Sequence, residues 1–358
     1  MEQLNPFVGV DLHLKTSQIT VMDSQGNNQQ KVKLSNDKQE IISFFNQLPR
    51  SASIAIEATY NWPWLVDTLE DLGFTPKLAH PKKVRIIAES AIKTDDVDSE
   101  ALAHLDRLNF LPLSYIPSQE DRQLREQLRY RQYLVKIRTA LKNRIHSTLA
   151  KLGIFHQFSD LFGKAGREFL VNIDMNPAYK TPIIEQLELI TLLDKKIDAA
   201  EKSVVKEQIA GNPAFSLMRT IPGIGSLSAA LLTIEIGPIS RFRHYKKLIS
   251  FGGLCSTISQ SANKTRYGHI NRDSNPFIRW VLIEAVPKAI KKDAKLAAYY
   301  HKIMIKKGKA KAKIAIARKL LIALYFMLKN NESYGLAHNI NKTTKKIYRL
   351  NPVLTLGA

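Results

Sequence analysis

The first third of the chain alternates between apolar and polar positions in short runs. Three of these runs, at residues 5–12, 17–22 and 29–34, have the length and alternation of β-strands. The segment Ser24–Asn28 has the composition of a turn between the last two runs. The pattern therefore predicts a β-meander at the start of the chain.

Helices and strands are expected to alternate after this meander. A helix begins after Asp37, which can act as its N-cap with Glu40 three residues later, and it runs to about Gln47. The next expected elements are a strand ending at Glu57, a helix from Trp62 to Leu72 and a short strand near Phe74–Leu78. This order is typical of an α/β layer with a mixed sheet.

The middle of the chain has the apolar spacing of long helices. Leucine and isoleucine recur at steps of three and four residues from Gln119 to Leu152, and the pattern returns from Ile183 to about Ile209. Residues 153–182 are expected to connect the two helices. The pair could fold back as an antiparallel hairpin or pair with another subunit. A solvated spacer is the alternative, and the length of the apolar stripes favours association.

A glycine-containing turn introduces the C-terminal part. The segment Thr220–Gly225 reads Thr-Ile-Pro-Gly-Ile-Gly and is followed by a helical run, which is the pattern of a helix–hairpin–helix. Its backbone N–H groups, around Gly223 and Gly225, could bind a phosphate of DNA. An ordinary turn between core helices is the alternative, and the basic charge of the chain favours the DNA contact.

The segment from Pro276 to Asn330 alternates apolar helical runs with lysines. A basic run at residues 306–313 contains Lys306, Lys307 and Lys309, which are suited to contact phosphates. The tail after Asn331 is expected to be poorly structured.

The charge of the chain indicates a polyanionic partner. Its 53 Lys and Arg exceed its 32 Asp and Glu, a formal net charge of +21. The excess is uneven: residues 1–117 hold 11 basic and 15 acidic residues, and residues 281–350 hold 17 basic and 3 acidic residues. Nucleic acid is the leading candidate partner. The C-terminal part is expected to bind it.

The remaining composition favours a cytoplasmic protein. Cys255 is the single cysteine, so no internal disulfide can form, and we expect a small buried hydrophobic residue there rather than a catalytic thiol. The start of the chain lacks the pattern of a signal peptide, and no run approaches the roughly 18 apolar residues of a membrane span.

Four carboxylates occupy positions that can form one metal site. Asp11 and Glu57 each lie at or near the end of an expected buried strand, and a charge there needs a partner or a cation. Asp95 and Asp98 are three residues apart, so they share one face of an expected helix. Together the four acids would make an all-oxygen site suited to Mg²⁺ or Mn²⁺.

A polar segment from Gly252 to Gly268 is expected to be a loop rich in hydroxyl groups, with cations close behind it. Phosphoryl transfer to a side chain needs a hydroxyl beside cations that stabilise the alkoxide and hold the phosphate. The candidate phosphate-binding cations are Lys264, Arg266 and Arg272.

Taken together, these motifs resemble those of the DEDD insertion-sequence transposases, the IS-one-ten group related to the Piv site-specific invertases. The segments that carry the resemblance, in the family's order, are Val8–Asp11, Ile56–Thr59, Lys93–Ser99, Ile221–Gly225 and the loop from Gly253 to Gly268. The resemblance covers most of the chain.

The resemblance implies an α/β plus α architecture in four parts. These are a RuvC-like, ribonuclease-H-like domain (1–117), a coiled-coil association region (118–210), a mostly helical transposase domain (211–335) and a basic tail (336–358). It implies that Asp11, Glu57, Asp95 and Asp98 are the catalytic acids, that Asp96 is outside the tetrad, and that Ser261 is the essential serine, ahead of Ser256 and Ser259.

The resemblance also implies partners. Members of the family are thought to recombine donor and target DNA through a serine–phosphate link, with homodimers that pair into a tetramer. Several are guided by a structured non-coding RNA. The expected protein is therefore a bacterial, nucleoid-associated transposase that uses magnesium.

Two alternatives remain open from the residues alone. One is a metal-dependent, structure-selective nuclease, such as a Holliday-junction resolvase, in which water attacks the phosphate and Ser261 is incidental. The other is a non-catalytic nucleic-acid-binding protein built on the helix–hairpin–helix and the basic helices. The second alternative explains the charge equally well, but it gives the four acids no purpose.

Overall fold

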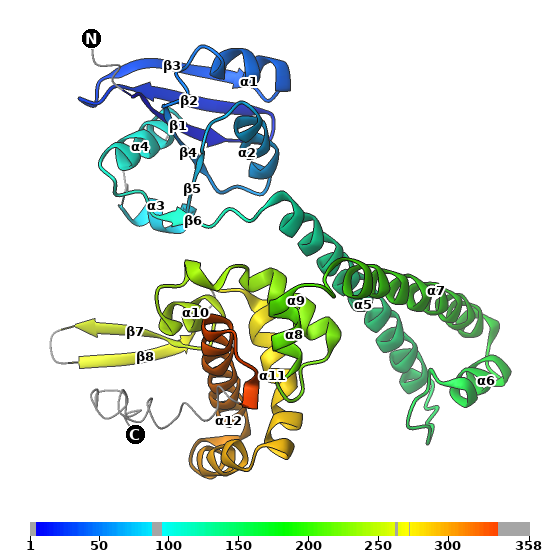
Figure 1. Ribbon diagram of the computed structural model, residues 1–358. Coiled ribbons are helices and arrows are strands. Elements are labelled where there is room, and N and C mark those ends of the chain that lie inside the picture. The colour runs from blue at the N-terminus through cyan, green and yellow to red at the C-terminus, as the bar shows by residue number, and fades with distance from the viewer. Residues whose placement is uncertain (1–4, 88–94, 262–263, 272, 336–358) are drawn as a thin grey trace. The chain divides into compact units, whose positions relative to one another are not determined.

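The computed structural model describes residues 5–87, 95–261, 264–271 and 273–335 (Figure 1). The chain divides into two compact units, Met1–Gln119 and Glu120–Ala358. The finer division expected at residues 210 and 335 stays a prediction. Residues 336–358, the expected basic tail, lie outside the described residues.

A mixed sheet forms the centre of the first unit. Its strands are β1 (Phe7–Leu12), β2 (Thr16–Met22), β3 (Asn28–Ser35), β4 (Ser53–Glu57), β5 (Lys77–Ala79) and β6 (Leu113–Ser114). Their order across the sheet is β3-β2-β1-β4-β5-β6. The first three strands are antiparallel neighbours, β1, β4 and β5 are parallel, and β6 is antiparallel to β5. The predicted meander and mixed α/β layer are confirmed.

Helices cover both faces of this sheet. They are α1 (Lys38–Phe45), α2 (Trp62–Asp71), α3 (Pro81–Ile87) and α4 (Asp95–Arg107). As predicted, Asp37 caps α1, because its side chain accepts from the backbone N–H groups of Gln39 and Glu40. The strand expected near Phe74–Leu78 begins later, at Lys77, and the two-residue strand β6 was not anticipated.

The alternation along the strands decides which side chains face which helices. Val8 and Val10 of β1 belong to the core that α1 and α2 close. The intervening residues of the strands face the other side, where Ala55 of β4 packs with Leu102 of α4. Since side chains alternate with a period of two, Asp11 lies on the same face of β1 as Gly9, towards α4.

The described residues of the second unit are helical apart from one hairpin. Its elements are α5 (Gln119–Lys151), α6 (Lys164–Asn172), α7 (Pro177–Lys202), the π-helix η1 (Ser203–Gln208), α8 (Pro213–Arg219), α9 (Ser226–Ile236), the 3₁₀-helix η2 (Ile239–Arg241), α10 (Tyr245–Phe251), β7 (Ser256–Ser261), β8 (Lys264–Ile270), α11 (Pro276–Lys292) and α12 (Ala294–Asn330). α12 bends at Gly308, whose φ of 83° is not helical.

The helices α5 and α7 lie against each other in opposite directions (Figure 1). Arg131 of α5 pairs with Glu201 near the end of α7, and Arg138, about two turns later on α5, pairs with Asp194, about two turns earlier on α7. Of the two arrangements left open by the sequence, the helices thus fold back on each other. The expected connecting insert contains the helix α6, which the sequence analysis missed. Whether these helices form a coiled coil between subunits stays a prediction.

The remaining helices pack around a large apolar core, with α9 and α11 at its centre. α9 is buried along nearly its whole length, from Ala229 to Ile236. Within the described part of the chain, no helix combines the length and the apolar character needed to cross a membrane.

Candidate functional site

Asp11 lies in a buried position near the end of β1. Only 5% of its side chain is exposed, because β1 is an inner strand with β2 and β4 on its two sides and α4 over its face. A carboxylate in such a place is costly unless other groups or a cation stabilise its charge.

The helix α4 places two more acids beside this strand. Its approach is close because β1 has a glycine at the crossing point: a Cβ atom on Gly9 would lie 2.7 Å from the backbone nitrogen of Ala103 and closer still to the carbonyl oxygen of Ser99. A buried hydrogen bond of 2.8 Å between the hydroxyls of Thr20 and Ser99 ties the helix to β2. The first turn of α4 is thereby fixed next to Asp11.

The other three predicted acids all act on the carboxyl group of Asp11. Burial raises the pKa of Asp11, and the nearby charges of Asp98 and Asp95 raise it further. His13 and a hydrogen bond with Glu57 shift that pKa in the opposite direction. The structure thus brings Asp11, Glu57, Asp95 and Asp98 together, from two parallel strands and one helix. Their role as metal ligands stays a prediction.

Asp96 differs from its neighbours in the expected way. Its side chain is exposed, whereas Asp95 and Asp98 are partly buried. One face of a helical turn holds positions i and i+3, so the residue between them points elsewhere. Asp96 does not contribute to the cluster around Asp11.

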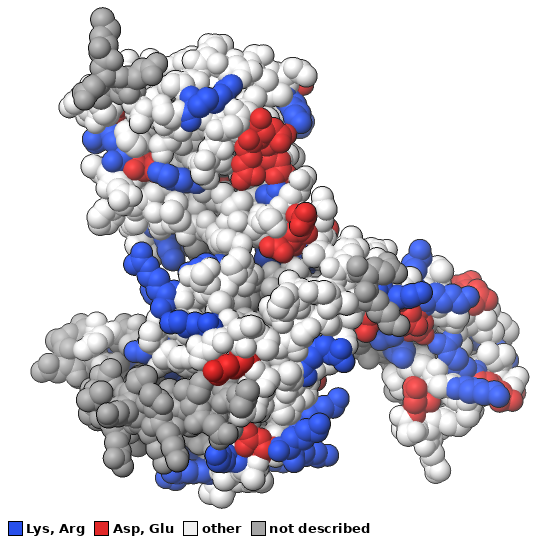
Figure 2. All heavy atoms as spheres, in the orientation of Figure 1, with Lys and Arg blue, Asp and Glu red and all other residues white. Residues whose placement is uncertain are grey.

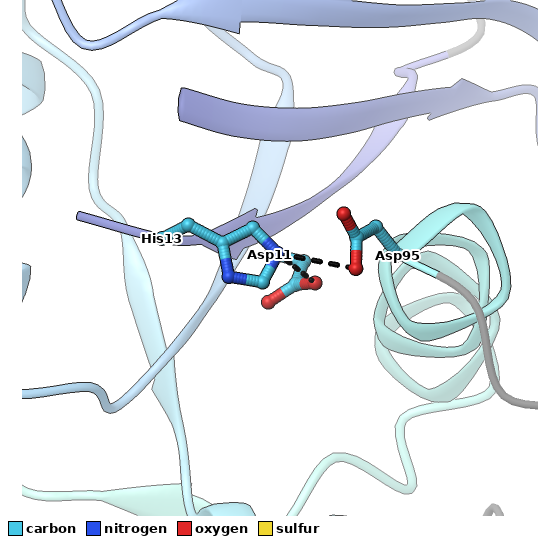
Figure 3. Close-up of side chains that lie close together, drawn as sticks. All are labelled: Asp11, His13 and Asp95. Atoms are coloured by element: carbon cyan, nitrogen blue, oxygen red, sulfur yellow. Dashed lines mark ion pairs between the residues drawn. The ribbon is translucent and has the colours of Figure 1, made fainter. Parts of the chain in front are cut away.

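The sequence analysis missed His13. Its imidazole Nε2 lies 3.2 Å from Oδ2 of Asp11 and 3.3 Å from Oδ1 of Asp95, so it stands between the two carboxylates (Figure 3). Nζ of Lys33 on β3 lies 3.5 Å from Oδ2, the other carboxylate oxygen of Asp95. The available signal was the position of His13, two residues after Asp11 and just beyond the strand.

The donor atoms of this cluster fit a divalent cation. Asp11, His13 and Asp95 each offer one ligand atom, and these atoms lie within 4.8 Å of one another. Oxygen ligands suit Mg²⁺ and Mn²⁺. A cation would also stabilise the buried charge of Asp11, whose pKa is raised by its surroundings.

The segment that carries Ser261 is a β-hairpin, so the prediction of a loop from Gly252 to Gly268 was wrong for residues 256–261 and 264–268. β7 and β8 are antiparallel, and Ser261, the last residue of β7, pairs with Lys264. The hairpin was overlooked because its sequence lacks an alternating run of apolar residues, and Ile258 of β7 is 61% exposed. Cys255, which precedes it, is partly buried.

Of the cations expected near the serine, Arg266 lies on β8 with an exposed side chain, paired in register with Ser259. Lys264 begins β8, and Arg272 lies outside the described residues. Ser261 and Lys264 thus lie opposite each other at the last paired position of the two strands.

The turn before α9 has the geometry of a tight connection between two helices. Gly223 has a φ of 92°, and a Cβ atom there would lie 2.6 Å from the carbonyl oxygen of Ala285 on α11. Gly225 is the N-cap of α9 and has open space beside it. Packing against α11 therefore explains Gly223 by itself, and phosphate binding by this turn stays a prediction.

The lysines of the basic run lie on α12. Lys306 and Lys309 are exposed and Lys307 is partly exposed, on both sides of the bend at Gly308. Figure 2 shows Lys and Arg side chains along the lower edge of the second unit, where Figure 1 draws the first half of α12. Their contact with phosphates is untested.

A second buried carboxylate, Glu235 on α9, was also missed. Its side chain is 2% exposed, and Arg129 of α5 donates to both of its oxygens at 3.1 and 3.2 Å. The amide nitrogen of Asn275 donates to Glu235 at 2.7 Å, and the amide oxygen of Asn275 caps α11, the helix after the serine hairpin. Arg125 adds an ion pair at 3.4 Å. Glu235 therefore joins α5, α9 and α11.

Known proteins resemble the chain over most of its length. A family model described as "Transposase", of the DEDD type of IS110, matches residues 8–154, and the "Transposase IS116/IS110/IS902 family" model matches residues 216–301. A "Probable family 20 transposase" of Pseudomonas aeruginosa is 24% identical over 70% of this chain and 75% of its own. The "Transposase for insertion sequence element IS1111A" of Coxiella burnetii is 24% identical over 75% of both chains.

A shorter match is to a protein whose name describes gene inversion. The "Pilin gene-inverting protein" of Moraxella bovis is 33% identical over 34% of this chain and 39% of its own.

Proposed function

Since the two transposase models together match residues 8–154 and 216–301, the chain belongs to the IS110 family of insertion-sequence transposases, enzymes that act on DNA, and we propose that it exchanges DNA strands through a phosphoserine link. The first unit would supply the metal centre, and the hairpin of the second unit would supply the nucleophile. The expected RuvC-like character of the first unit is part of this proposal, supported by its mixed sheet and the position of its acids.

The environment of Asp11 carries the proposal. Charging a buried carboxylate with a raised pKa, surrounded by three further acids, is costly, and a cation bound beside it would offset that cost. Asp11, Glu57, Asp95 and Asp98 would hold Mg²⁺ or Mn²⁺. When bound, the cation would polarise the scissile phosphate and stabilise the leaving 3′-oxygen.

Ser261 would act as the nucleophile. Its hydroxyl oxygen bonds to phosphorus and loses its proton, while the bond from phosphorus to the 3′-oxygen breaks and that oxygen takes up a proton. Attack by a 3′-hydroxyl of another strand then re-forms a phosphodiester and frees the serine. Each step exchanges one phosphoester for another, so no high-energy cofactor is needed. Lys264, Arg266 and Arg272 would hold the phosphate.

The nature of the intermediate tests this proposal. Ser261→Ala should abolish covalent protein–DNA adducts on denaturing gels while leaving DNA binding intact, and Ser256→Ala, at the other end of β7, should retain the adducts. Asp11→Asn should abolish cleavage at any Mg²⁺ concentration. Adducts that persist in Ser261→Ala would reject the nucleophile. Cleavage without any adduct would instead favour the structure-selective nuclease.

Binding of nucleic acid by the second unit is the next part of the proposal. The net charge of +21 and the exposed Lys306 and Lys309 support it. The turn at Gly223 and Gly225 would add a phosphate contact as part of a helix–hairpin–helix. A structured guide RNA would be bound along with donor and target DNA. Purifying the protein with its nucleic acid and sequencing that nucleic acid tests this directly. RNA from the non-coding end of the element is the expected finding, and DNA alone would reject the guide.

The hairpin of α5 and α7 is proposed to join subunits. Tyr130 and Tyr133 on α5 and Leu189 and Leu192 on α7 are large apolar residues with about half of their surface exposed. Such residues are suited to the interface of a coiled coil. Light scattering should give a dimer without DNA and a tetramer with it. A monomer at all concentrations would reject this part of the proposal.

A further inference from the structure

The histidine that follows the first acid occupies a site built around it. The carbonyl oxygen of His13 accepts two side-chain amides, from Asn36 after β3 and from Asn61 before α2, both at 2.8 Å. Its backbone N–H donates to the carbonyl of Thr16 at 3.0 Å. Three neighbouring segments of chain therefore fix the backbone of one half-exposed residue.

The two amides are themselves oriented by hydroxyl groups. Ser17 donates to the amide oxygen of Asn36 at 2.6 Å, and Thr59 donates to that of Asn61 at 2.9 Å. With its oxygen occupied, each amide directs its N–H₂ group towards the carbonyl of His13. Metal ligands in proteins are typically held by hydrogen-bonding partners of this kind.

The imidazole points into the acidic cluster rather than into solvent (Figure 3). Its Nε2 atom lies 3.2 Å from one oxygen of Asp11 and 3.3 Å from one oxygen of Asp95. Neighbouring ligand atoms of a six-coordinate ion with bonds of about 2.1 Å lie about 3 Å apart, since they subtend a right angle at the metal. Nε2 therefore has the spacing of an adjacent ligand to each of the two oxygens.

We propose that His13 is a nitrogen ligand of the metal centre and gives it a preference for transition-metal dications over Mg²⁺. This inference rests on the proposed function, because it takes the carboxylates as the other ligands. Mg²⁺ is bound through oxygen, whereas imidazole suits first-row transition metals, so a mixed set of ligands shifts the selectivity. The amides of Asn36 and Asn61 act as positioning groups for this ligand.

Mn²⁺ is the probe that reports the ligand directly. Pulsed electron paramagnetic resonance of the full-length protein with Mn²⁺ should show the coupling of a directly bound ¹⁴N nucleus. His13→Gln should remove that coupling and weaken Mn²⁺ binding at least roughly tenfold, with a smaller effect on Mg²⁺. His104→Gln, a half-exposed histidine of α4 that lies near Glu100, is the matched control and should keep the signal.

The outcomes separate this inference from the proposed function. Tight Mn²⁺ binding without ¹⁴N coupling, or coupling that survives in His13→Gln, overturns the nitrogen ligand and leaves the carboxylate centre in place. Failure of the wild-type protein to bind Mn²⁺ or Mg²⁺ overturns the metal centre itself. Circular dichroism confirms that each variant is folded. The wild-type spectrum alone decides whether a nitrogen is bound, even where a variant fails to fold.

Discussion

Replacing Gly9 by alanine should separate helix α4 from strand β1 and thereby disperse the acids. A methyl group at this position would lie 2.7 Å from the backbone nitrogen of Ala103, whereas ordinary contact begins at 3.4 Å. The difference is 0.7 Å, and the carbonyl oxygen of Ser99 is closer still. Both obstacles are backbone atoms, so the helix itself has to move.

The size of the effect follows from that displacement. Overpacking of a core typically costs about 1–3 kcal/mol of stability. The functional cost should be larger, because Asp95 and Asp98 move with the helix while Asp11 stays on the strand. Metal sites whose supporting contacts are lost typically bind about 10–100-fold more weakly, and we expect a loss of that size for Mn²⁺.

Calorimetric titration of Mn²⁺ into the folded full-length variant measures this loss. Gly73→Ala is the control: Gly73 has a φ of 86° and open space beside it, so alanine there costs about 1–2 kcal/mol of backbone strain. Gly73 lies between α2 and β5, at the end of the parallel strands away from the acids. The variant should therefore leave Mn²⁺ binding unchanged. If Gly9→Ala binds Mn²⁺ like the wild type, α4 does not position the acids as argued.

Three further predictions concern other parts of the chain. Glu235→Ala should destabilise the second unit by about 3 kcal/mol in urea denaturation, the lower end of the range for breaking a buried ion pair because Arg129 is 44% exposed; a loss under 1 kcal/mol would contradict this. Without metal, Asp11→Asn should melt higher than the wild type at pH 7. Because the pKa of Asp11 is raised in the folded protein, the stability of the wild type falls as the pH rises from 3.8 through the raised pKa. The higher melting temperature of the variant should therefore disappear below the ordinary pKa of 3.8. A variant that melts lower than the wild type at pH 7 would refute this prediction. Neutralising Lys306, Lys307 and Lys309 together should reduce the salt dependence of DNA binding by roughly one unit of slope per lysine, and an unchanged slope would exclude them from the interface.

Much of the first unit could be predicted because its strands are regular. Alternation locates the strands, and it also determines the face on which Asp11 lies once α4 is known to cover the Gly9 side. The pairing of distant segments was not accessible in this way. The parallel pairing of β1 with β4 follows from no local pattern, and it is this pairing that brings Glu57 beside Asp11.

His13 shows why the site could be predicted only in part. A polar residue just beyond a strand is common, and the residues that fix it come from two other loops, at Asn36 and Asn61. Their amides meet at one carbonyl only after the sheet has formed. The oxygen ligands could be proposed from sequence because buried acids are unusual, whereas a half-exposed histidine is not.

The prediction for the serine hairpin was wrong for a different reason. Strand prediction relies on a regular alternation of apolar and polar residues, which the sequences of β7 and β8 lack, so composition alone suggested a loop. The segment does contain residues that favour strands, Thr257, Ile258 and Tyr267 among them. Their β-propensity was the signal that the abundance of serine obscured.

Glu235 offered a signal that was not used. It stands within the apolar run from Leu231 to Ile236, and a charge in a fully buried helix requires partners. Those partners lie 106 positions earlier, in Arg129, and 40 positions later, in Asn275. Asn275 also caps α11 and donates its backbone N–H to Phe251, so one carboxylate holds the base of the serine hairpin against the long helix α5. Loss of Glu235 should therefore affect the hairpin and α5 together, whereas a change confined to α7 should leave the hairpin in place.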